Sequence, residues 1–160
     1  MAVDVSAMGL KVTIVAVPSY PVGFTITQFA DDGDSVNVPD MTIMQSGMGV
    51  NGDLVVWRTA TPCNVTLNVI AGTDDCDNLE NLFKLNITQK NKIASKDLIT
   101  MSIEHPDGTI SMLTNGYIVA GKPVQDYSSN GRAKSRAFSF VFENNIIMSI
   151  KIARLNKKFQ

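Results

Sequence analysis

Residues 47–58 read Gly47-Met-Gly-Val-Asn-Gly-Asp53-Leu-Val-Val-Trp-Arg58. A turn leads from them to a second alternating segment, Cys63–Ile70, and an acidic stretch then opens the sequence Asn78-Leu-Glu-Asn-Leu-Phe83. The three glycines predict a mobile loop, because glycine adopts backbone angles that other residues avoid. The alternating segments predict strands, and the last segment predicts the start of a helix. Nothing in this stretch is typical of a catalytic centre; it is typical of a β-protein that assembles with copies of itself.

The two alternating segments predict a hairpin. Leu54–Arg58 and Cys63–Ile70 flank the short connection Thr59-Ala-Thr-Pro62, a length suited to antiparallel neighbours. In Cys63–Ile70, apolar side chains alternate with Asn and Thr, which indicates a sheet with one buried face. Trp57, the only tryptophan, has two interpretations: an anchor in the core or on a sheet face, or an exposed contact between subunits.

One substantial helix is predicted, from about Asn78 to about Lys90. Asp77 is a favourable N-cap residue, and Glu80 three residues later completes a capping-box-like pattern. The acids Asp74 and Asp75 also lie where the helix dipole favours negative charge. Apolar residues at helical spacing form one stripe for packing on the sheet: Leu79, Leu82, Phe83 and Ile87.

Alternating and β-branched segments predict strands through the rest of the chain. They are Lys11–Val17, Gly23–Phe29, Ser35–Val38, Met41–Met44, Leu98–Glu104, Thr109–Leu113, Tyr117–Ala120, Arg136–Glu143 and Ile146–Ala153. Turn sequences separate them, among them Asp31-Asp-Gly-Asp34, His105-Pro-Asp-Gly108 and Asn144-Asn145, the last suited to a tight hairpin. Many strands with one helix in the middle of the order predict a mainly β fold: an antiparallel two-sheet sandwich or barrel with one α-helix packed on it.

Length and composition fit a single domain over residues 1–160, with 146–160 as a C-terminal extension. With 44% hydrophobic and 18% charged residues, the chain can bury a core without a disulfide or metal. Cys63 and Cys76 are therefore predicted to be free thiols in a reducing compartment. The chain has no apolar run long enough for a membrane span and no basic-then-apolar N-terminal segment, which predicts no membrane association and no export signal.

The two halves of the chain carry opposite charge. Residues 1–83 hold two basic residues and ten acids, a net charge of −8, whereas residues 84–160 hold twelve basic residues and five acids, a net charge of +7. Opposite potentials suit head-to-tail contact between identical copies. The alternative is that both kinds of charge interleave on the folded surface, where the asymmetry cancels.

The sequence offers little chemistry for catalysis. The single histidine, His105, lies in a Pro-Asp-Gly turn and is interpreted as a solvated turn residue; with two distant cysteines it does not complete a metal site. Asp31, Asp32 and Asp34 could hold Ca²⁺ only loosely, because the twelve-residue pattern and its bidentate Glu are missing. We therefore expect no catalytic residue, no metal, no cofactor and no enzyme activity. The scattered basic residues form no nucleic-acid-binding motif.

The order of these features resembles a known family. An acidic turn leads to a long Gly-containing loop, to the predicted hairpin of Gly52–Arg58 and Asn64–Val69, and to a helix with the pattern Asn-Leu-x-x-Leu-Phe. Late in the chain a strand is broken at Gly121-Lys-Pro123 and is followed by Arg136-Ala-Phe-Ser-Phe-Val-Phe142. From about Tyr20 to about Asn145, the chain is similar to the tail tube proteins of contractile-tailed bacteriophages and their relatives at the baseplate end of the tube.

The resemblance implies a two-sheet, barrel-like core with one helix, an architecture that the type VI secretion tube protein shares. It implies hexameric rings stacked head to tail around a lumen that carries DNA during ejection, with tail sheath and baseplate proteins as further partners. The protein would belong to the virion after assembly in the host cytoplasm, and DNA would pass without specific binding. A slightly acidic protein suits such a conduit, which predicts that some of Asp31, Asp32, Asp34 and Asp53 face the lumen.

In the family, a long loop between early strands reaches a neighbouring ring or subunit. The matching contact residues here are Pro39, Met41, Met44, Ser46, Gly47, Met48, Gly49, Val50, Asn51, Gly52 and Asp53. The strand and tail from Ile146 onward depart from the family pattern, which leaves open a repeating tube subunit or a specialised initiator ring of the baseplate. From other classes, a monomeric ligand- or carbohydrate-binding β-barrel would use exposed aromatics such as Trp57, Tyr20 or Tyr127, and a hydrolase without a visible motif is a third alternative.

Overall fold

The structure, a computed structural model, describes residues 6–143 and 146–151. Ten strands and one helix lie within these residues. In chain order they are β1 (Lys11–Val17), β2 (Tyr20–Ile26), β3 (Val36–Asn37), β4 (Met44–Met48), β5 (Leu54–Arg58), β6 (Cys63–Val69), α1 (Asp74–Asn86), β7 (Leu98–Glu104), β8 (Thr109–Gly121), β9 (Arg136–Phe142) and β10 (Ile146–Lys151). The predicted mainly β fold with one helix is confirmed. Within the same residues, no helix is long and apolar enough to cross a membrane.

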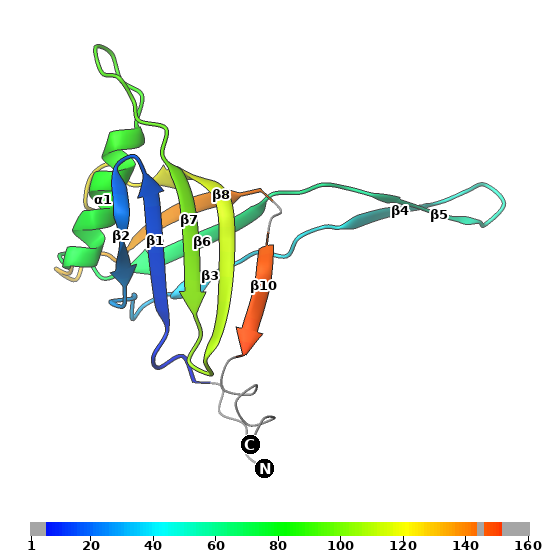
Figure 1. Cartoon of the computed structure of the whole chain (residues 1–160), viewed down its shortest axis with the longest axis horizontal. Helices are drawn as coiled ribbons and strands as arrows, with labels where there is room; N and C mark the ends of the chain where they lie inside the picture. Colours follow the sequence, from blue (N-terminus) through cyan, green and yellow to red (C-terminus); the bar gives the residue numbers. More distant parts are fainter. Residues whose placement is uncertain (1–5, 144–145, 152–160) are drawn as a thin grey trace.

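Eight of the strands form one antiparallel sheet that folds into two layers (Figure 1). Its order is β2-β1-β7-β8-β9-β6-β3, and β10 also pairs with β8. The long strand β8 belongs to both layers, because its first half pairs with β7 and β10 and its second half pairs with β9. The strand bends at Asn115, which has a positive φ of 55°, and at Gly116, which is paired with both Ile99 and Phe142. The two segments predicted on either side of this point are therefore one bent strand.

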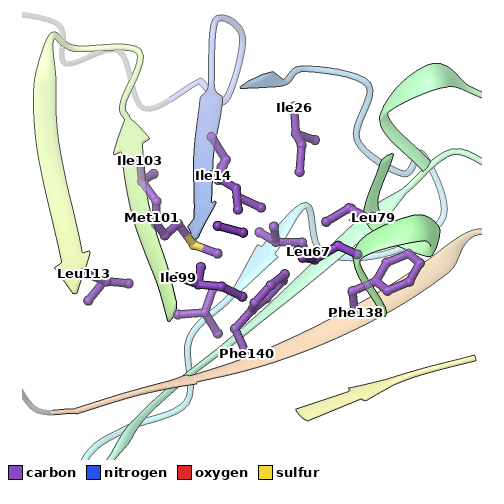
Figure 2. Packing of buried hydrophobic residues seen from close by; sticks show 14 of the residues in the cluster. Ile14, Ile26, Leu67, Leu79, Ile99, Met101, Ile103, Leu113, Phe138 and Phe140 are labelled. Atoms are coloured by element: carbon purple, nitrogen blue, oxygen red, sulfur yellow. The ribbon is translucent and has the colours of Figure 1, made fainter. Parts of the chain in front are cut away.

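The core lies between the two layers and beneath α1 (Figure 2). Strands β1, β6, β7 and β9 bury alternate residues, as their sequence pattern predicts. Figure 2 shows Ile14 and Met101 of the first layer, Leu67 and Phe140 of the second, and Leu79 of α1 gathered in this space, and all five are fully buried. Each such side chain contributes about 1.5–3 kcal/mol when it is removed from water.

Helix α1 begins about one turn earlier than predicted. Thr73 is the N-cap, since its hydroxyl accepts a hydrogen bond from the Cys76 N–H (3.3 Å). The predicted N-cap, Asp77, is wrong: it lies in the first turn with two other acids, where the helix dipole stabilises them. The helix ends at Asn86 rather than near Lys90, because the backbone beyond it is extended. The buried members of the predicted stripe are Leu79 and Leu82.

Strand β5 does not pair with β6, so the predicted hairpin is wrong. It pairs with β4 over five residue pairs in a separate two-stranded sheet, while β6 pairs with β9 and β3. An alternating pattern predicts a strand but does not identify the strand with which it pairs. The turn between β4 and β5 is closed by a local hydrogen bond, in which the Gly49 N–H donates to the Asp53 carbonyl (2.8 Å). The predicted mobile loop Ser46–Asp53 is therefore the end of β4 and a tight turn, and the strand predicted at Met41–Met44 begins only at its last residue.

Part of the predicted C-terminal extension joins the sheet. β10 pairs antiparallel with the first half of β8. Asn144 and Asn145, predicted to form a tight hairpin turn, lie outside the described residues. The strands on either side of them, β9 and β10, do not pair with each other; both pair with β8, at different positions along it.

A buried carboxylate ties the end of α1 to the first layer. Asp97 is fully buried and accepts hydrogen bonds from the Ser19 N–H (3.1 Å), the Ser19 hydroxyl (2.8 Å) and the Asn86 side-chain amide (2.8 Å). In return, the Asp97 N–H donates to the Asn86 side-chain oxygen (3.1 Å). Asn86 is thereby held against the residue that precedes β7, which explains why the helix stops there.

The Asp97→Ala variant is expected to lose about 2 kcal/mol of unfolding free energy, because three donors lose a charged acceptor. Urea denaturation measures the loss. Asp40→Ala is the matched control: Asp40 is exposed, so its removal should change stability by less than about 0.5 kcal/mol. Equal stability of the two variants would contradict the structural role of Asp97.

Candidate assembly interface

The two-stranded sheet β4–β5 and its turn, residues 44–58, form an arm that stands away from the body of the protein (Figure 1). Its strands are not hydrogen-bonded to the eight-stranded sheet. At its base, the Thr59 N–H donates to the Ile43 carbonyl (3.1 Å) and the Thr61 hydroxyl donates to the Thr42 carbonyl (3.1 Å). These contacts keep the two segments that leave the body side by side, so the arm is an ordered ribbon.

The arm exposes large apolar side chains on both strands. All of β5 is exposed, as is β4 except for Gly47. The exposed apolar residues are Met44, Met48, Val50, Leu54, Val55, Val56 and Trp57. An isolated two-stranded hairpin is marginally stable in water, and contiguous apolar surface of this kind marks an interaction site.

The register gives the arm two different faces. Paired residues share a face of an antiparallel ribbon, so Gln45 lies beside Trp57 and Gly47 beside Val55. The Trp57 indole N–H donates to Gln45 Oε1 (3.1 Å), and the Trp57 ring covers Gly47, where an added Cβ would lie 3.7 Å from it. The other face is aliphatic and rich in sulfur; it carries Met44, Ser46, Met48, Leu54, Val56 and Arg58. One face of the arm thus presents the flat ring of Trp57, and the other presents flexible Met and Leu side chains that can adjust to the surface of a partner.

Few charges interrupt this surface. Between Met41 and Ala60, only Asp53 and Arg58 are charged. The centres of protein–protein interfaces are depleted in charge and enriched in Met and aromatic residues. The arm therefore has the composition of an interface centre and the exposure of a free surface.

One protein family matches most of the chain. The model of the family described as tail fiber protein gp32 matches residues 3–146. The chain belongs to the tail fiber protein gp32 family. No curated protein matches it.

Solved structures share the fold of this gp32-family chain. A chain of the PVC sheath–tube complex of an extracellular contractile injection system in the extended state matches with a TM-score of 0.50 and 13% identity, over 88% of each chain. A chain of the PVC sheath/tube terminator matches with a TM-score of 0.51 and 13% identity, over 92% of this chain and 96% of that one. A chain of the anti-feeding prophage baseplate matches with a TM-score of 0.52 and 9% identity, over 95% and 99%. The predicted resemblance to contractile tail tube proteins and their baseplate-end relatives is confirmed.

The predicted contact residues of this gp32-family member fall in two places. From Met44 to Asp53 they form the first strand and the turn of the arm, whereas Pro39 and Met41 lie in the connection from β3. Their contact with a neighbour stays a prediction. The predicted contact residues do not include Leu54–Arg58. The run Leu-Val-Val-Trp in this segment is apolar on both faces of the strand, whereas a strand with one face in solvent alternates apolar and polar residues. This difference is the sequence signal that could have identified the segment as part of the interface. Trp57 does not lie in the core; it lies on one face of the arm and is 48% exposed, and its contact with another subunit stays a prediction.

Of the four acids among which lumen-facing residues are predicted, Asp31, Asp32 and Asp34 lie in the connection between β2 and β3, and Asp53 lies in the turn of the arm. Asp31 Oδ1 is 2.5 Å from Arg132 Nη2, and this hydrogen bond holds the pKa of the Asp31 carboxyl below its usual range. Asp32 Oδ1 accepts a hydrogen bond from the Ser135 hydroxyl (2.6 Å), and Asp34 is exposed. Their position relative to a lumen stays a prediction.

The candidate reactive side chains of the described chain are His105, Cys63 and Cys76. Within it, no three His, Cys, Asp or Glu side chains are placed to hold a metal ion. His105 Nε2 lies 3.1 Å from Ser111 Oγ beside the turn between β7 and β8. Cys63 and Cys76 are free and buried. Burial raises the pKa of both thiols, which makes them poor nucleophiles.

Proposed function

We propose that the chain is a structural subunit of the inner tube of a phage tail, or of the ring that starts this tube at the baseplate, and that its copies join through the arm. In this proposal six copies close a ring, rings stack head to tail, and DNA passes through the lumen without specific contact. The gp32 family and the shared fold support a structural role in a tail or baseplate. The tail sheath and baseplate proteins would be its partners in the virion.

The observation that carries the proposal is the arm. When a projection from one subunit is received by a different surface of the next copy, the contact repeats until it closes a ring or extends a filament. Neighbours in a ring can also cover the ends of the sheet, which are β2 and β3 among the described strands. Uncovered edge strands would otherwise promote aggregation.

The arrangement of the aromatic residues does not favour a monomeric carbohydrate-binding module. Trp57 lies on the arm, whereas Tyr127 lies in the connection between β8 and β9. Tyr20 is half-buried and packs edge-on against Phe24, with 5.2 Å between ring centroids. Such a module needs its aromatic side chains on one concave surface, and these three come from separate parts of the fold.

The double variant Leu54→Glu/Val56→Glu tests the proposal. Both side chains lie on the aliphatic face of the arm and are more than half exposed (67% and 54%), so the fold should tolerate the change. We expect rings or tubes of the wild-type protein in electron micrographs and by sedimentation. The variant should sediment as a monomer with an unchanged circular dichroism spectrum, because two desolvated carboxylates cost several kcal/mol at an interface.

Met8→Glu is the control, since Met8 is 87% exposed but lies outside the arm; this variant should assemble like the wild type. Wild-type protein that stays monomeric at high concentration would contradict the proposal, above all if it bound a small ligand saturably. Assembly of the arm variant equal to that of the wild type would contradict the role of the arm.

A further inference from the structure

Acids gather near the N-terminal end of α1, where Arg132 pairs with Asp31 and Arg136 with Glu80, and four lysines gather at and beyond the other end of the helix. The N–H groups of Thr27 and Gln28 donate to Asp75 Oδ2 (3.0 and 3.1 Å), which holds the segment before the acidic turn against the first turn of the helix. The acids at this end are Asp31, Asp32, Asp34, Asp74, Asp75 and Asp77. The lysines at and beyond the other end are Lys84, Lys90, Lys92 and Lys96. A helix of this length spans about 20 Å, so the acids at one end lie apart from the four lysines at the other.

The basic end carries a projection, here named the finger, made of residues 87–97 between α1 and β7 (Figure 1). The Lys92 N–H donates to the Gln89 carbonyl (3.2 Å), and Asn91 between them has a positive φ of 62°. The Lys92 ammonium also donates to the Lys84 carbonyl at the end of the helix. The finger is therefore an ordered turn, and residues 81–96 contain four lysines and no acid.

The tip of the finger presents an apolar side chain among these lysines. Ile93 is 98% exposed, and Lys90 is exposed three residues before it. A single exposed isoleucine needs no explanation on its own. The exposure of Ile93 becomes informative if another surface of the same molecule is complementary to the finger.

Such a surface lies beside the first turns of α1. A cavity of about 310 Å³ is lined there by Ala71, Gly72, Cys76, Asp77, Glu80, Gln125, Tyr127, Ala133 and Arg136. The Arg136 side chain is only 4% exposed, and its Nε–H has no hydrogen-bond acceptor within the described chain. The cavity thus combines small and aromatic side chains with two acids, one of which, Glu80, is already paired with Arg136.

We propose that the finger of one copy docks into this cavity of the next copy. Ile93 would enter beside the apolar wall, and the Lys90 ammonium would face the Asp77 carboxylate. The finger and the cavity belong to opposite ends of one helix, so the finger cannot fill the cavity of its own chain. The contact therefore joins two different surfaces head to tail, and it extends into a stack when its rotation does not close a ring. This proposal rests on the proposed tube function, and it identifies the surfaces through which successive rings are in contact.

Two complementary variants test the docking. In Lys90→Glu an acidic side chain of the finger meets Asp77 at the cavity; in Asp77→Lys a lysine at the cavity meets Lys90 of the finger. Each variant alone should need about tenfold more protein to stack, because like charges oppose each other across the contact. In an equimolar mixture every finger can meet a cavity of opposite charge, so stacking should return in alternating copies. Light scattering and tube length in electron micrographs measure both results.

The mixing experiment separates this proposal from the tube function itself. Rings that form through the arm but stack normally in Lys90→Glu would overturn the docking and leave the tube function intact. A mixture that stacks no better than either variant, while both keep the wild-type circular dichroism spectrum, would also overturn it. Lys11→Glu, which changes an exposed lysine on β1, is the control and should stack like the wild type. Absence of rings in the wild type would instead count against the proposed function.

Discussion

The Glu80→Gln variant is expected to lose about 3 kcal/mol of unfolding free energy, because it leaves a buried cation unpaired. Glu80 Oε2 lies 2.9 Å from Arg136 Nη1, and Glu80 Oε1 lies 2.7 Å from Lys84 Nζ. The Arg136 side chain is 4% exposed, so water cannot replace the lost carboxylate. Its remaining contacts, the Lys122 carbonyl and the Phe138 ring, do not neutralise its charge. Guanidinium chloride denaturation measures the loss.

The size of this loss should depend on pH. The hydrogen bond from Lys84, together with the charges of Arg136 and Lys84, holds the pKa of Glu80 below its usual range. The native carboxylate thus binds a proton less readily than the unfolded one. Its stabilisation is present above the unfolded pKa and is lost as the pH falls through the folded pKa. The difference between wild type and Glu80→Gln should therefore be largest near neutral pH and shrink below about pH 4.

Lys84→Gln is the matched control, because it removes the other cation of Glu80. Lys84 is 54% exposed, and an exposed pair at this helical spacing contributes only about 0.3–0.5 kcal/mol. Equal losses in Glu80→Gln and Lys84→Gln would show that the exposed pair, and not the burial of Arg136, carries the stabilisation. A difference between wild type and Glu80→Gln that is constant down to acid pH would show that the charge of the Glu80 carboxylate does not carry the stabilisation.

The Gly116→Ala variant is expected to lose about 3 kcal/mol of unfolding free energy, at the upper end of the cost of overpacking. A Cβ at this position would lie 2.1 Å from Phe142 Cδ1 and 2.4 Å from Cε1. The Phe142 ring is 1% exposed, so it cannot move aside without displacing other core side chains. Gly116 also pairs with both β7 and β9, so a shift there disturbs the join between the two layers.

Two other glycines calibrate this effect. At Gly121 an added Cβ would lie 3.0 Å from the Phe138 ring and 3.2 Å from the Phe83 ring, a milder conflict that we expect to cost about 1 kcal/mol. At Gly33 it would meet nothing within 4 Å, so Gly33→Ala should change stability by less than about 0.5 kcal/mol. Thermal unfolding of the three alanine variants should follow this order. A Gly116→Ala variant as stable as Gly33→Ala would contradict the packing described at the bend of β8.

The strands that line the core follow from the sequence most directly. Lys11–Val17 and Leu98–Glu104 have the predicted bounds, because a strand with one buried face alternates in hydrophobicity. The helix is predicted correctly in kind but not in extent. Thr73 and Asp77 are both favourable N-cap residues for a helix. Which of them caps α1 depends on where the chain leaves β6. The end at Asn86 depends on Asp97, which is distant in sequence and is brought there by the first layer.

For the stretch from Gly47 to Phe83, the residues alone establish two strands, a glycine-rich turn and the start of a helix. The packing in three dimensions decides which strand each one joins. Cys63–Val69 buries its apolar side chains in the core, whereas Leu54–Arg58 is apolar on both faces and exposed throughout. A hydrophobic pattern indicates that the apolar side chains of a strand are buried by some other surface. Which strand it pairs with depends on which strand has a free edge nearby in the folded chain. The body of this chain has room for β6 between β9 and β3, and it leaves β5 on the arm with its apolar faces available to another copy.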